Sequence, residues 1–457
     1  MQRITAVFTV ISSSRLMATA STTIVNDSPL QVLPSIDLPN LIQRKATDHM
    51  QCNDEPFNIV DIGDIVHKIK MWLSLLPRVH PYFALKCNVD RGFLATLLAF
   101  GFGFEGVSKA EIDTVLKMGA SPEKIIFANP YKPISHIKYA AYQNVNLMTF
   151  DNVTELYKIK EFYPKARLLL RLKFDDPRSK YELGKKYGVE IDEVTHILQI
   201  ARELQLNVVG ISYHVGGGYT DACNFLKAIE LAKTAFNYAK SIGINFNVLD
   251  IGGGFPGQAN SLFKKICSNI SSALDKHFPV EDNISIIAEP GRYFAETAFT
   301  LVLCVAGKRE IYEIDQKIPV YNKGCIKKKF RNEACNKKKF EYYVNDGRYG
   351  SFSEFLMSYG CQYPQVIGKK SETLYSTRLW GPTVSGSDCI FEECYLPELE
   401  VGDLIYFEEM GAYTTVLGTN FNGLTRPVSY YVIDQGMWNV AKHKLLTKFK
   451  AVDEYSA

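Results

Sequence analysis

Strong charge of either sign and long hydrophobic runs are both absent from this sequence. The 457 residues include 52 Lys and Arg and 49 Asp and Glu, which gives a formal net charge of +3. Such a small excess is no reason to expect a nucleic-acid partner. No apolar run reaches the roughly 20 residues that a membrane-spanning helix needs. The sequence therefore predicts a globular protein without a membrane or nucleic-acid partner, with 46% hydrophobic residues to build its cores.

Cysteines in metal-binding or disulfide patterns are also absent. The ten cysteines are scattered, without the paired spacings of a zinc site or the regular framework of a small secreted domain. This usage is typical of reduced thiols in a cytoplasmic protein, because disulfides persist mainly in oxidising compartments. It also predicts that the protein has no metal site.

The first 26 residues contain no acidic side chain, whereas Ser and Thr are frequent and two arginines are present. That composition suits a transit peptide, and the apolar run Ile4–Ile11 before Ala18-Thr19-Ala20 offers a poor signal peptide as the alternative. Met17 would also serve as an alternative start. We favour a partly disordered cytoplasmic extension over residues 1–34.

A basic segment lies at residues 323–339, with lysine triplets at 327–329 and 337–339. The surrounding stretch from Lys308 to Phe340 has no clean period, so we expect an exposed insertion there. Charge runs of this kind are usually solvated loops. An acidic partner is the alternative interpretation.

Between about residues 80 and 300 the sequence repeats one unit: a short apolar run, a polar or glycine-rich turn, and an amphipathic helical stretch. Eight runs are strand-like: 82–86, 103–106, 124–128, 146–150, 168–172, 208–214, 248–251 and 286–289. The helical stretches include 110–118, 134–142, 191–206 and 221–242. Eight units predict an α/β fold with a TIM-type (β/α)8 barrel over residues 35–300. A doubly wound open sheet, the rival fold, would need only five or six strands.

After about residue 300 the pattern changes to strands separated by turns, with few helical stretches. The strand-like runs are 299–306, 340–344, 404–407, 414–417 and 428–433. We therefore predict a C-terminal all-β domain over residues 301–457. A strand from about residues 24–45, upstream of the barrel, is expected to contribute to it.

Polar side chains gather where the barrel strands end. They are Lys86, Glu105 with Ser108, Asn129, Asp151, Arg171, His214, the turn Gly252–Gly254, and Glu289 with Arg292. Active sites of such barrels lie at the C-terminal ends of the strands. So many convergent polar groups therefore predict an active site at that end.

Lys86 is the first candidate for chemistry. A lysine at a barrel mouth can form a Schiff base, because burial lowers its pKa and frees the amine. The structural alternative is a lysine whose long side chain simply reaches the surface. Gly252-Gly253-Gly254 directly follows a strand and can bring backbone N–H groups close to a phosphate, although a bare glycine turn is often only flexible.

The other candidates complete the set that a pyridoxal 5′-phosphate (PLP) enzyme needs. Glu289 can hold a pyridinium nitrogen, Arg292 can bind a phosphate, and His214 can stack on a flat ring. Their structural alternatives are an ion pair within the loop 289–292 and an ordinary core histidine. Tyr413 can donate its hydroxyl to a phosphate, though alone it is more often structural. Together with Lys86, these residues favour PLP as the cofactor.

Seven motifs occur in one order: PYFALKCN (81–88), YHVGGG (213–218), LDIGGGFPG (249–257), AEPGRY (288–293), VNDGRYGSF (344–352), LWGPT (379–383) and MGAYT to FNG (410–423). Over roughly residues 35–440 the chain resembles the eukaryotic ornithine decarboxylase family, including its antizyme-inhibitor relatives. The resemblance implies an alanine-racemase-like barrel, PLP-dependent decarboxylation of ornithine to putrescine in polyamine biosynthesis, and a homodimer with active sites at the interface.

The resemblance also implies roles for single residues. Lys86 would be the Schiff-base lysine, His214 would stack on the cofactor ring, and Glu289 would pair with the pyridinium nitrogen. The implied cofactor-binding set is Lys86, Arg171, His214, Gly217, Gly252, Gly253, Gly254, Glu289, Arg292 and Tyr413. The implied substrate pocket is Tyr349, Ser358, Val384, Ser385 and Phe421.

The chain departs from the family pattern in several places. Gly217 replaces a serine and Glu105 an aspartate near the cofactor. Val384 replaces the cysteine that guides protonation, and Ser385 and Ser358 replace the two acids that face the distal ammonium of ornithine. A buried ammonium without a charged partner is costly. We therefore expect weak ornithine activity or a substrate with a less basic distal end.

Alternatives remain open at this point. A shifted loop with Asp388 and Cys389 would restore an acid to the pocket. A stretch at 125–156, with Lys132 and Lys138, resembles the antizyme-binding region of the family. The alternative function is therefore a catalytically weak or inactive PLP-binding homologue that binds antizyme, although the retained cofactor residues argue against a pure binding role. Loss of the cysteine also admits a decarboxylation-dependent transaminase.

Overall fold

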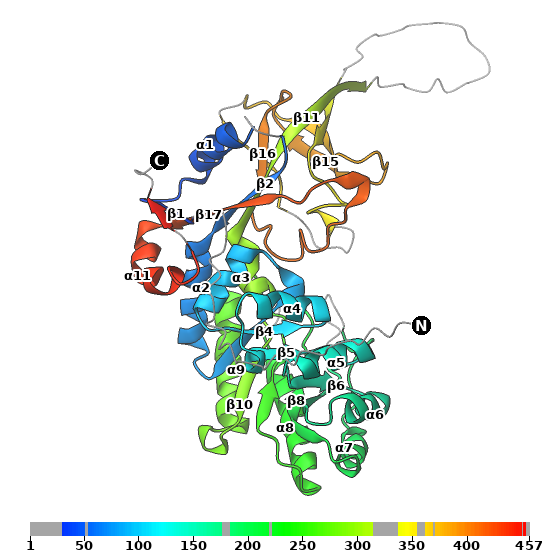
Figure 1. Cartoon of the computed structure of the whole chain (residues 1–457). Coiled ribbons are helices and arrows are strands. Elements are labelled where there is room, and N and C mark those ends of the chain that lie inside the picture. The colour runs from blue at the N-terminus through cyan, green and yellow to red at the C-terminus, as the bar shows by residue number, and fades with distance from the viewer. Residues whose placement is uncertain are drawn as a thin grey trace, which may run out of the picture.

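The computed structural model describes residues 30–50, 54–175, 183–218, 222–313, 337–353, 362–368, 371–449 and 451–453. The described part of the molecule consists of a barrel and a twisted sheet, one above the other (Figure 1). Residues 1–29 of the predicted extension over residues 1–34, and the lysine triplet at 327–329, lie outside the described residues.

The helices and strands alternate through the first two thirds of the chain. They are β1 (Leu30–Leu33), α1 (Leu38–Met50), β2 (Phe57–Asp61), α2 (Ile62–Leu75), β3 (Val79–Ala84), α3 (Arg91–Ala99), β4 (Gly103–Gly106), α4 (Lys109–Lys117), β5 (Ile125–Phe127), α5 (Ile134–Tyr142), β6 (Leu147–Phe150), α6 (Val153–Phe162), β7 (Arg167–Arg171), α7 (Val194–Glu203), β8 (Asn207–Ser212), α8 (Asn224–Ser241), β9 (Val248–Asp250), α9 (Ser261–His277), β10 (Ser285–Ala288) and α10 (Arg292–Ala295).

Strands dominate the remainder. They are β11 (Phe299–Glu313), β12 (Lys337–Val344), β13 (Gln365–Val366), β14 (Tyr375–Trp380), β15 (Cys389–Leu396), β16 (Leu404–Phe407), β17 (Val428–Asp434) and β18 (Ala451–Asp453), with helix α11 (Gln435–Leu445) after β17. Short polar residues begin many of the helices. Asp90, Ser108, Asn152 and Asp434, for example, accept hydrogen bonds from backbone N–H groups in the first turns of α3, α4, α6 and α11.

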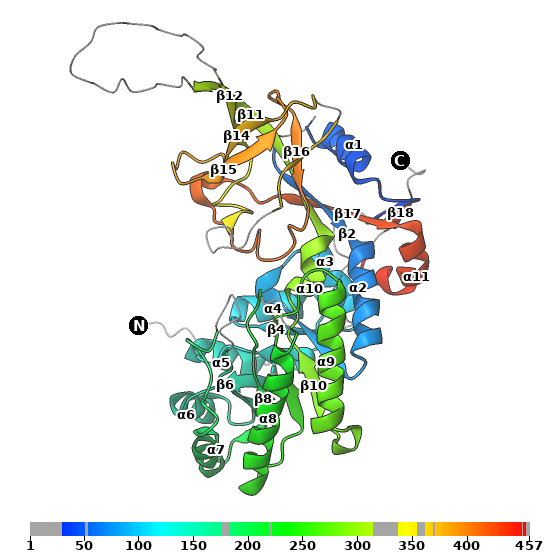
Figure 2. The same ribbon diagram turned by 180° about the vertical axis from the view of Figure 1, so that it is seen from behind.

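Eight parallel strands close the barrel in the order β10-β3-β4-β5-β6-β7-β8-β9. Alternation within the strands produces two packing layers. Side chains such as Ile126, Leu147, Leu169, Val248 and Ile287 form a small cluster inside the barrel. Their neighbours along the strands pack outward against the helices, including the long α8 and α9 (Figure 2). The TIM-type prediction is confirmed, because all eight expected runs supply one strand each.

A second, mixed sheet of ten strands packs above the barrel mouth. Eight of them follow the order β15-β14-β12-β11-β2-β17-β1-β18, and β16 and β13 branch from it, with β16 paired to β11 and β13 paired to β16. Strand β11 holds it together: its first half pairs with β2 and β16, and its second half pairs with β12 beyond a bulge at Val305/Gly307. Side chains of β11, β12, β14, β15 and β16 form one hydrophobic core. A second core packs α1 against the sheet. Figure 1 shows α1 and α11 beside this sheet.

Three predictions about this part need correction. Residues 35–61 were assigned to the barrel, but β2 pairs with β11 and β17 and α1 packs on the sheet. The run 414–417 is a turn, because Thr414 Oγ1 and backbone groups close local hydrogen bonds there. The expected insertion from Lys308 begins and ends as paired strand, with Glu313 opposite Lys337. Apolar alternation could not show which sheet a strand joins.

Candidate active site

Lys86 follows β3 directly, in a short 3₁₀ turn at Leu85–Cys87. Its Nζ lies 3.2 Å from both carboxylate oxygens of Glu105, which lies in β4. The Lys86 side chain keeps 42% of its surface accessible at the mouth, whereas that of Glu105 keeps 1%. Loss of solvent lowers the Lys86 pKa, but the Glu105 and Glu289 carboxylates outweigh it, so the pKa is raised overall. The amine is therefore held as an ammonium by its partners.

His214 follows β8 and approaches the same region. The Gly216 N–H donates to its Nδ1 at 3.0 Å, so Nε2 carries the proton of the neutral ring. Burial, followed by the positive charges of Lys86 and Arg171, holds the pKa of His214 well below its usual range. The structure thus supplies a neutral, oriented imidazole. It is suited to packing on a flat ring and poorly suited to carrying charge.

Asp250 and Glu289 form a buried carboxyl pair at the ends of β9 and β10. Asp250 Oδ1 accepts the Gly252 N–H at 2.9 Å, while its buried Oδ2 has no hydrogen-bond partner among the described residues, and the two carboxyl groups interact electrostatically. Burial, with a smaller contribution from Glu105, raises the Asp250 pKa to about 7, and burial plus Asp250 raises the Glu289 pKa well above its usual range. The pair therefore retains a proton that a basic ring nitrogen can share.

The glycine turn packs tightly against these groups. The Glu289 N–H donates to the Gly252 carbonyl at 2.7 Å. A Cβ on Gly253 would lie 2.7 Å from the Glu289 carbonyl oxygen and 2.8 Å from His214 Nε2. Gly252 and Gly254 have φ of +63° and +108°, which disfavour other residues. The turn is thus a close-fitting part of the site and not merely flexible chain.

Arg292 and Tyr413 meet beside that turn. Arg292 begins α10, and its guanidinium lies 5.2 Å from the centre of the Tyr413 ring. Tyr413 comes from the sheet domain, and its N–H donates to the Cys87 carbonyl at 2.9 Å, next to Lys86. Its φ of +57° is unusual for an aromatic residue. The strained loop is fastened further by Asn88 Nδ2, which donates to the Gly411 carbonyl at 2.7 Å.

Arg171 ends β7 and completes the barrel side. Its guanidinium lies 5.2 Å from the centre of the Tyr187 ring, and its charge lowers the pKa of His214 and opposes the rise at Lys86. Gly217 lies in the loop after His214, between Gly216 and Gly218, which both have positive φ.

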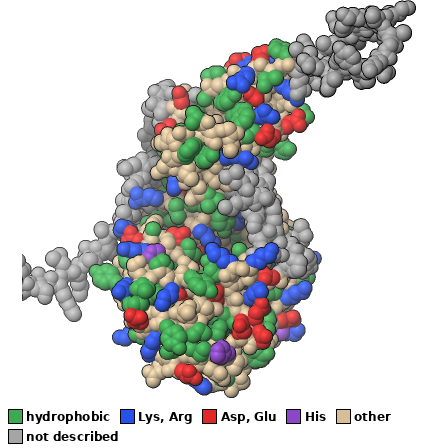
Figure 3. Space-filling view, turned by 90° about the vertical axis from the view of Figure 1, so that its right-hand side faces the viewer, with side chains coloured by type: hydrophobic (Ala, Val, Ile, Leu, Met, Phe, Trp, Pro, Cys, Tyr) green, Lys and Arg blue, Asp and Glu red, His purple; other side chains and the backbone are tan. Residues whose placement is uncertain are grey.

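The surface in Figure 3 shows Lys and Arg side chains gathered near the waist, where barrel and sheet domain meet.

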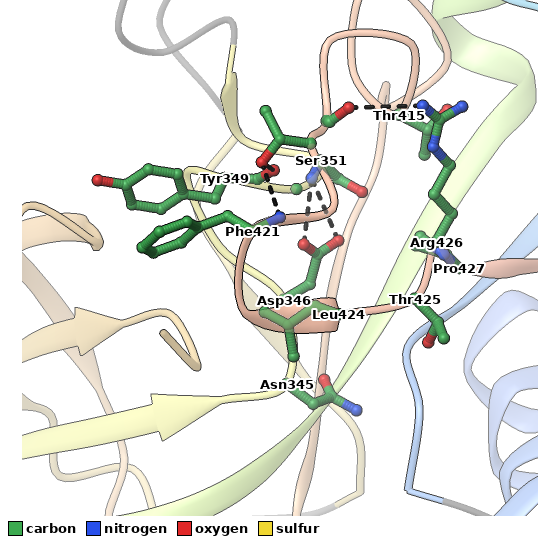
Figure 4. Close-up of a pocket in the computed structure, with 13 residues that line it drawn as sticks. Asn345, Asp346, Tyr349, Ser351, Thr415, Phe421, Leu424, Thr425, Arg426 and Pro427 are labelled. Atoms are coloured by element: carbon green, nitrogen blue, oxygen red, sulfur yellow. Dashed lines mark hydrogen bonds between the residues drawn. The ribbon is translucent and has the colours of Figure 1, made fainter. Parts of the chain in front are cut away.

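The expected substrate residues lie on the sheet domain. Tyr349 and Phe421 stack with ring centres 4.6 Å apart, and the two rings lie side by side in Figure 4. The Tyr349 hydroxyl and Ser385 Oγ are 2.9 Å apart. Val384 is 91% exposed and Phe421 is 43% exposed. Ser358 lies outside the described residues.

Asp388 is not available as a replacement acid. Its side chain is 1% exposed and accepts the Arg348 N–H, the Thr383 N–H and the Thr383 hydroxyl at 2.8, 3.0 and 2.7 Å. Cys389 is buried in β15, paired with Trp380. The proposed loop shift is therefore wrong for this structure, because Asp388 already serves to hold the loop together.

The antizyme-like stretch needs a correction too. Lys132 is buried, and its Nζ contacts the carbonyls of Asn129 and Thr149 and the Glu155 carboxylate at 3.0, 2.6 and 2.9 Å. It therefore cannot contact a partner directly. Lys138 is exposed and lies 4.7 Å from the centre of the Phe162 ring.

The sequence reasoning missed Asp250, Glu296 and Lys68. Asp250 stands inside the apolar run 248–251, and its place directly before the glycine turn was the available signal. Lys68 approaches the site only through folding and gave no signal, whereas Glu296 lies four residues after Arg292, and that helical spacing was the available signal. Within the described ranges, no group of three or more His, Cys, Asp or Glu is placed to hold a metal ion. No helix of the described part is long and apolar enough to cross a membrane.

The arrangement of these residues in the structure fits PLP. It offers an amine at the barrel mouth, a close-packed glycine turn beside an arginine, and a buried carboxyl pair with a proton to share. The positive charges of Lys86 and Arg171 help burial to keep His214 neutral by lowering its pKa. A phosphate-bearing, flat, basic heterocycle is the kind of molecule that uses all of these groups.

Comparison with known proteins gives the same picture. The family model described as pyridoxal-dependent decarboxylase, pyridoxal binding domain, matches residues 62–296. The chain is 41% identical over 408 residues to the ornithine decarboxylase of Mus musculus, covering 88% of this chain and 86% of that protein. It is also 41% identical over 408 residues to antizyme inhibitor 2 of Xenopus laevis, covering 88% and 87%.

Solved structures agree. An arginine decarboxylase of Paramecium bursaria Chlorella virus bound to agmatine has a TM-score of 0.77 at 34% identity, covering 86% of this chain and all of that one. A lysine/ornithine decarboxylase of Vibrio vulnificus complexed with putrescine has a TM-score of 0.73 at 27% identity, covering 89% of this chain and all of that one.

Proposed function

The chain belongs to the family of pyridoxal-dependent decarboxylases that includes the ornithine decarboxylases, and from this membership we propose how its residues work. We propose that the protein decarboxylates an amino acid with PLP as its cofactor, as a cytoplasmic enzyme. The observation that carries the proposal is the convergence of Lys86, Glu105, His214 and Glu289 at one end of a closed barrel. A structural ion pair alone would not need the neutral histidine and the protonated carboxyl pair beside it.

Lys86 would supply the amine to which the cofactor aldehyde attaches, and would give up that place to the amine of the substrate. Glu105 holds that amine at 3.2 Å from two oxygens and so fixes its direction. Because the same contacts keep Lys86 protonated, Glu105 must also take up or pass on a proton when the amine reacts. Glu105 is thus proposed to position Lys86 and to act as its proton partner.

Bound PLP supplies an electron sink for the carbanion left after loss of CO₂. Glu289 supports this chemistry by holding a proton at the ring nitrogen, with Asp250 behind it. His214 packs on the ring and stays neutral, so it adds no competing positive charge. Arg292, Tyr413, Gly217 and the turn Gly252–Gly254 are proposed to bind the phosphate, and Arg171 to support the pocket on the β7 side.

The substrate pocket is proposed to lie against Tyr349, Ser385 and Phe421, with Val384 at its edge, and Ser358, which lies outside the described residues, stays a predicted member. Its described residues offer hydroxyl groups and aromatic rings, and the nearby Asp388 is fully occupied. An ammonium at the distal end of ornithine would lose charged partners there, which costs binding. We therefore propose a substrate whose distal end is less basic, with ornithine as a weak substrate.

A homodimer with active sites at the subunit interface is part of the proposal. The exposed Val384 and Phe421 support it, because a working substrate pocket needs cover that one chain does not give them. Exposed apolar side chains of this kind are typical of surfaces that meet a partner.

A second candidate is a regulatory homologue that binds antizyme. The likeness to antizyme inhibitor 2 favours it, as does an exposed apolar surface on and around α5 formed by Tyr131, Ile134 and Tyr142, which are 50%, 43% and 81% exposed. This candidate needs cofactor binding but no turnover.

One assay separates these functions. Purified protein saturated with PLP is incubated with ornithine, lysine and a panel of neutral and aromatic amino acids, and CO₂, amine and aldehyde are measured. Turnover of a neutral or aromatic amino acid supports the proposed enzyme, whereas efficient putrescine formation contradicts the proposed substrate pocket. A silent panel with the cofactor absorbance intact supports the regulatory candidate, and aldehyde indicates a transaminase.

A further inference from the structure

Behind the phosphate side of the site lies a buried network of charges that the proposed catalytic groups do not include. Lys68, on α2, is 2% exposed. Its Nζ donates to the Gly257 carbonyl at 2.7 Å and lies 3.6 Å from Asp64 Oδ2. A lysine with this little exposure is rare unless its charge is compensated. The Lys68 side chain therefore reaches Gly257, which follows the glycine turn and lies 189 positions further along the chain.

Glu296 forms the other half of this network. One of its carboxylate oxygens accepts a hydrogen bond from Arg292 Nη1 at 2.5 Å. The other is so close to Gly257 that a Cβ there would lie 1.6 Å from Oε2 and 2.7 Å from the Glu296 Cβ. The Glu296 carboxylate therefore fills the space that a side chain at position 257 would take. Both Lys68 and Glu296 contact Gly257, one at its carbonyl and one at its Cα.

Opposite charges alternate across these contacts, with Glu409 as a further nearby anion. Lys68 and Arg292 are the cations, and Asp64 and Glu296 are the anions. The Asp64 carboxylate is also bound by the Thr297 hydroxyl at 2.6 Å. Burial raises the Glu296 pKa, and Arg292 opposes that rise; burial lowers the Lys68 pKa, and Asp64 and Glu296 oppose it. Each half of the network therefore helps to keep the other charged.

The same network reaches the loop that carries Tyr413. The Gly411 N–H donates to the Glu296 carbonyl at 3.0 Å, and Gln258 Nε2 donates to the Glu409 carboxylate at 2.7 Å. Glu409 thus ties the residue after Gly257 to the sheet domain. The glycine turn, Arg292 and the Tyr413 loop, which come from three separate segments, all meet this one cluster.

We propose that Lys68 and Glu296 are positioning residues that hold the glycine turn and Arg292 in register to receive the cofactor phosphate. Lys68 fixes the Gly257 carbonyl, three residues after the glycine turn, and Glu296 fixes one edge of the Arg292 guanidinium. The inference rests on the proposed phosphate site, and it assigns that site's geometry to two residues that need not touch the cofactor.

The test compares PLP with pyridoxal, which has the same ring and aldehyde but no phosphate. Both are titrated into cofactor-free protein, and attachment at Lys86 is followed by absorbance. We expect Glu296→Gln to weaken PLP binding about tenfold, the loss of one charge-assisted hydrogen bond, and to leave pyridoxal binding within about twofold. Gly257→Ala, which displaces the Glu296 carboxylate without changing charge, should have the same selective effect.

Lys132 and Glu155 provide a matched control, because they form a comparable buried pair in which the lysine also donates to backbone carbonyls. Glu155→Gln should leave the preference for PLP over pyridoxal unchanged. In an Arg292→Met background the Glu296→Gln effect should disappear, which is the sign that it acts through Arg292.

Equal weakening of PLP and pyridoxal would mean general destabilisation and would overturn the positioning role. So would an unchanged preference in both Glu296→Gln and Gly257→Ala. If the unmodified protein itself forms no adduct, or binds PLP no better than pyridoxal, then the proposed phosphate site fails and this inference fails with it. A preference that is present in the unmodified protein but insensitive to both variants overturns the inference alone.

Discussion

The barrel side and the sheet side of the site are built from different kinds of side chain. On the barrel side, ionisable groups stand at strand ends and contact one another, as Lys86 does Glu105 and Asp250 does Glu289. On the sheet side, Tyr349, Ser385 and Phe421 present hydroxyl groups and rings. The barrel side is committed to one cofactor, because any change there leaves a buried charge without its partner. The sheet side carries no such constraint, so it can be altered for another substrate while the cofactor chemistry is kept.

The two sides differ in exposure as well. Glu105 and Asp250 are essentially buried, whereas Val384 is 91% exposed. The electrostatics of the cofactor half are therefore complete within one chain. The substrate half is open, and its final shape depends on what covers it. Changes on the barrel side should consequently have larger effects than changes on the sheet side.

The largest effect is expected for Lys86→Ala. Without the amine the cofactor cannot be attached covalently, and decarboxylation should fall by at least about 10³-fold. The measurement is CO₂ release together with the absorbance of bound PLP. Glu155→Gln serves as the folded control. Retention of more than a tenth of the activity would show that Lys86 does not carry the reaction.

Glu289→Gln should have the next largest effect, a loss of about 10²-fold in kcat with the cofactor still bound. The amide cannot keep a proton on the ring nitrogen, so the ring becomes a weaker electron acceptor. Single-turnover decarboxylation and the cofactor spectrum check this. If Glu289→Gln keeps kcat but Asp250→Asn loses it, then the roles of the two carboxyl groups are exchanged.

Ser385→Asp sharpens the comparison from the sheet side. A carboxylate beside Tyr349 would restore a partner for a distal ammonium, so kcat/KM for ornithine should rise about tenfold. Ser385→Asn, of similar size but neutral, is the control. An equal rise with both variants would show that shape and not charge limits ornithine.

The smallest effect is a pH dependence of stability. The Asp250 pKa is raised from 3.8 to about 7 in the folded protein, so the folded state holds the extra proton and its stability is lost as pH rises through about 7. The melting temperature of cofactor-free protein should fall by roughly 2 to 4 °C between pH 5 and pH 8 relative to Asp250→Asn. Asp61, whose pKa is raised to about 6, titrates in the same direction in both proteins and cancels in that difference. Parallel curves for the two proteins would place the titration elsewhere.

Much of the fold followed from local pattern. The eight short apolar runs, separated by turns and helical stretches, are visible without any tertiary information, and each became one barrel strand. Strand ends were less certain, as at Lys86, which was placed in the strand and lies in the turn after it. The membership of β2 in the upper sheet was not visible, because its apolar pattern is the same as that of a barrel strand.

The site residues likewise divide into those that local pattern predicts and those that it does not. Strand-end residues such as His214 and Glu289 could be predicted, since a closed parallel barrel brings all strand ends to one rim. The occupation of Asp388 by Arg348 and Thr383 could not, because those hydrogen bonds depend on how a single loop folds back. The burial of Lys132 could not be predicted either, because its sequence neighbours are typical of a surface position.

The sequence by itself determined the barrel, the cofactor class and the family, because these depend on periodicity and on side chains that must stand at particular strand ends. Tertiary structure alone decided which charges meet. Lys86 joins Glu105, Lys68 joins Gly257, and the strained Tyr413 loop is brought to the barrel mouth. Such pairings are set by side-chain reach across elements far apart in the chain, and the free energy of a buried ion depends on the few ångströms to its partner, which no local pattern records.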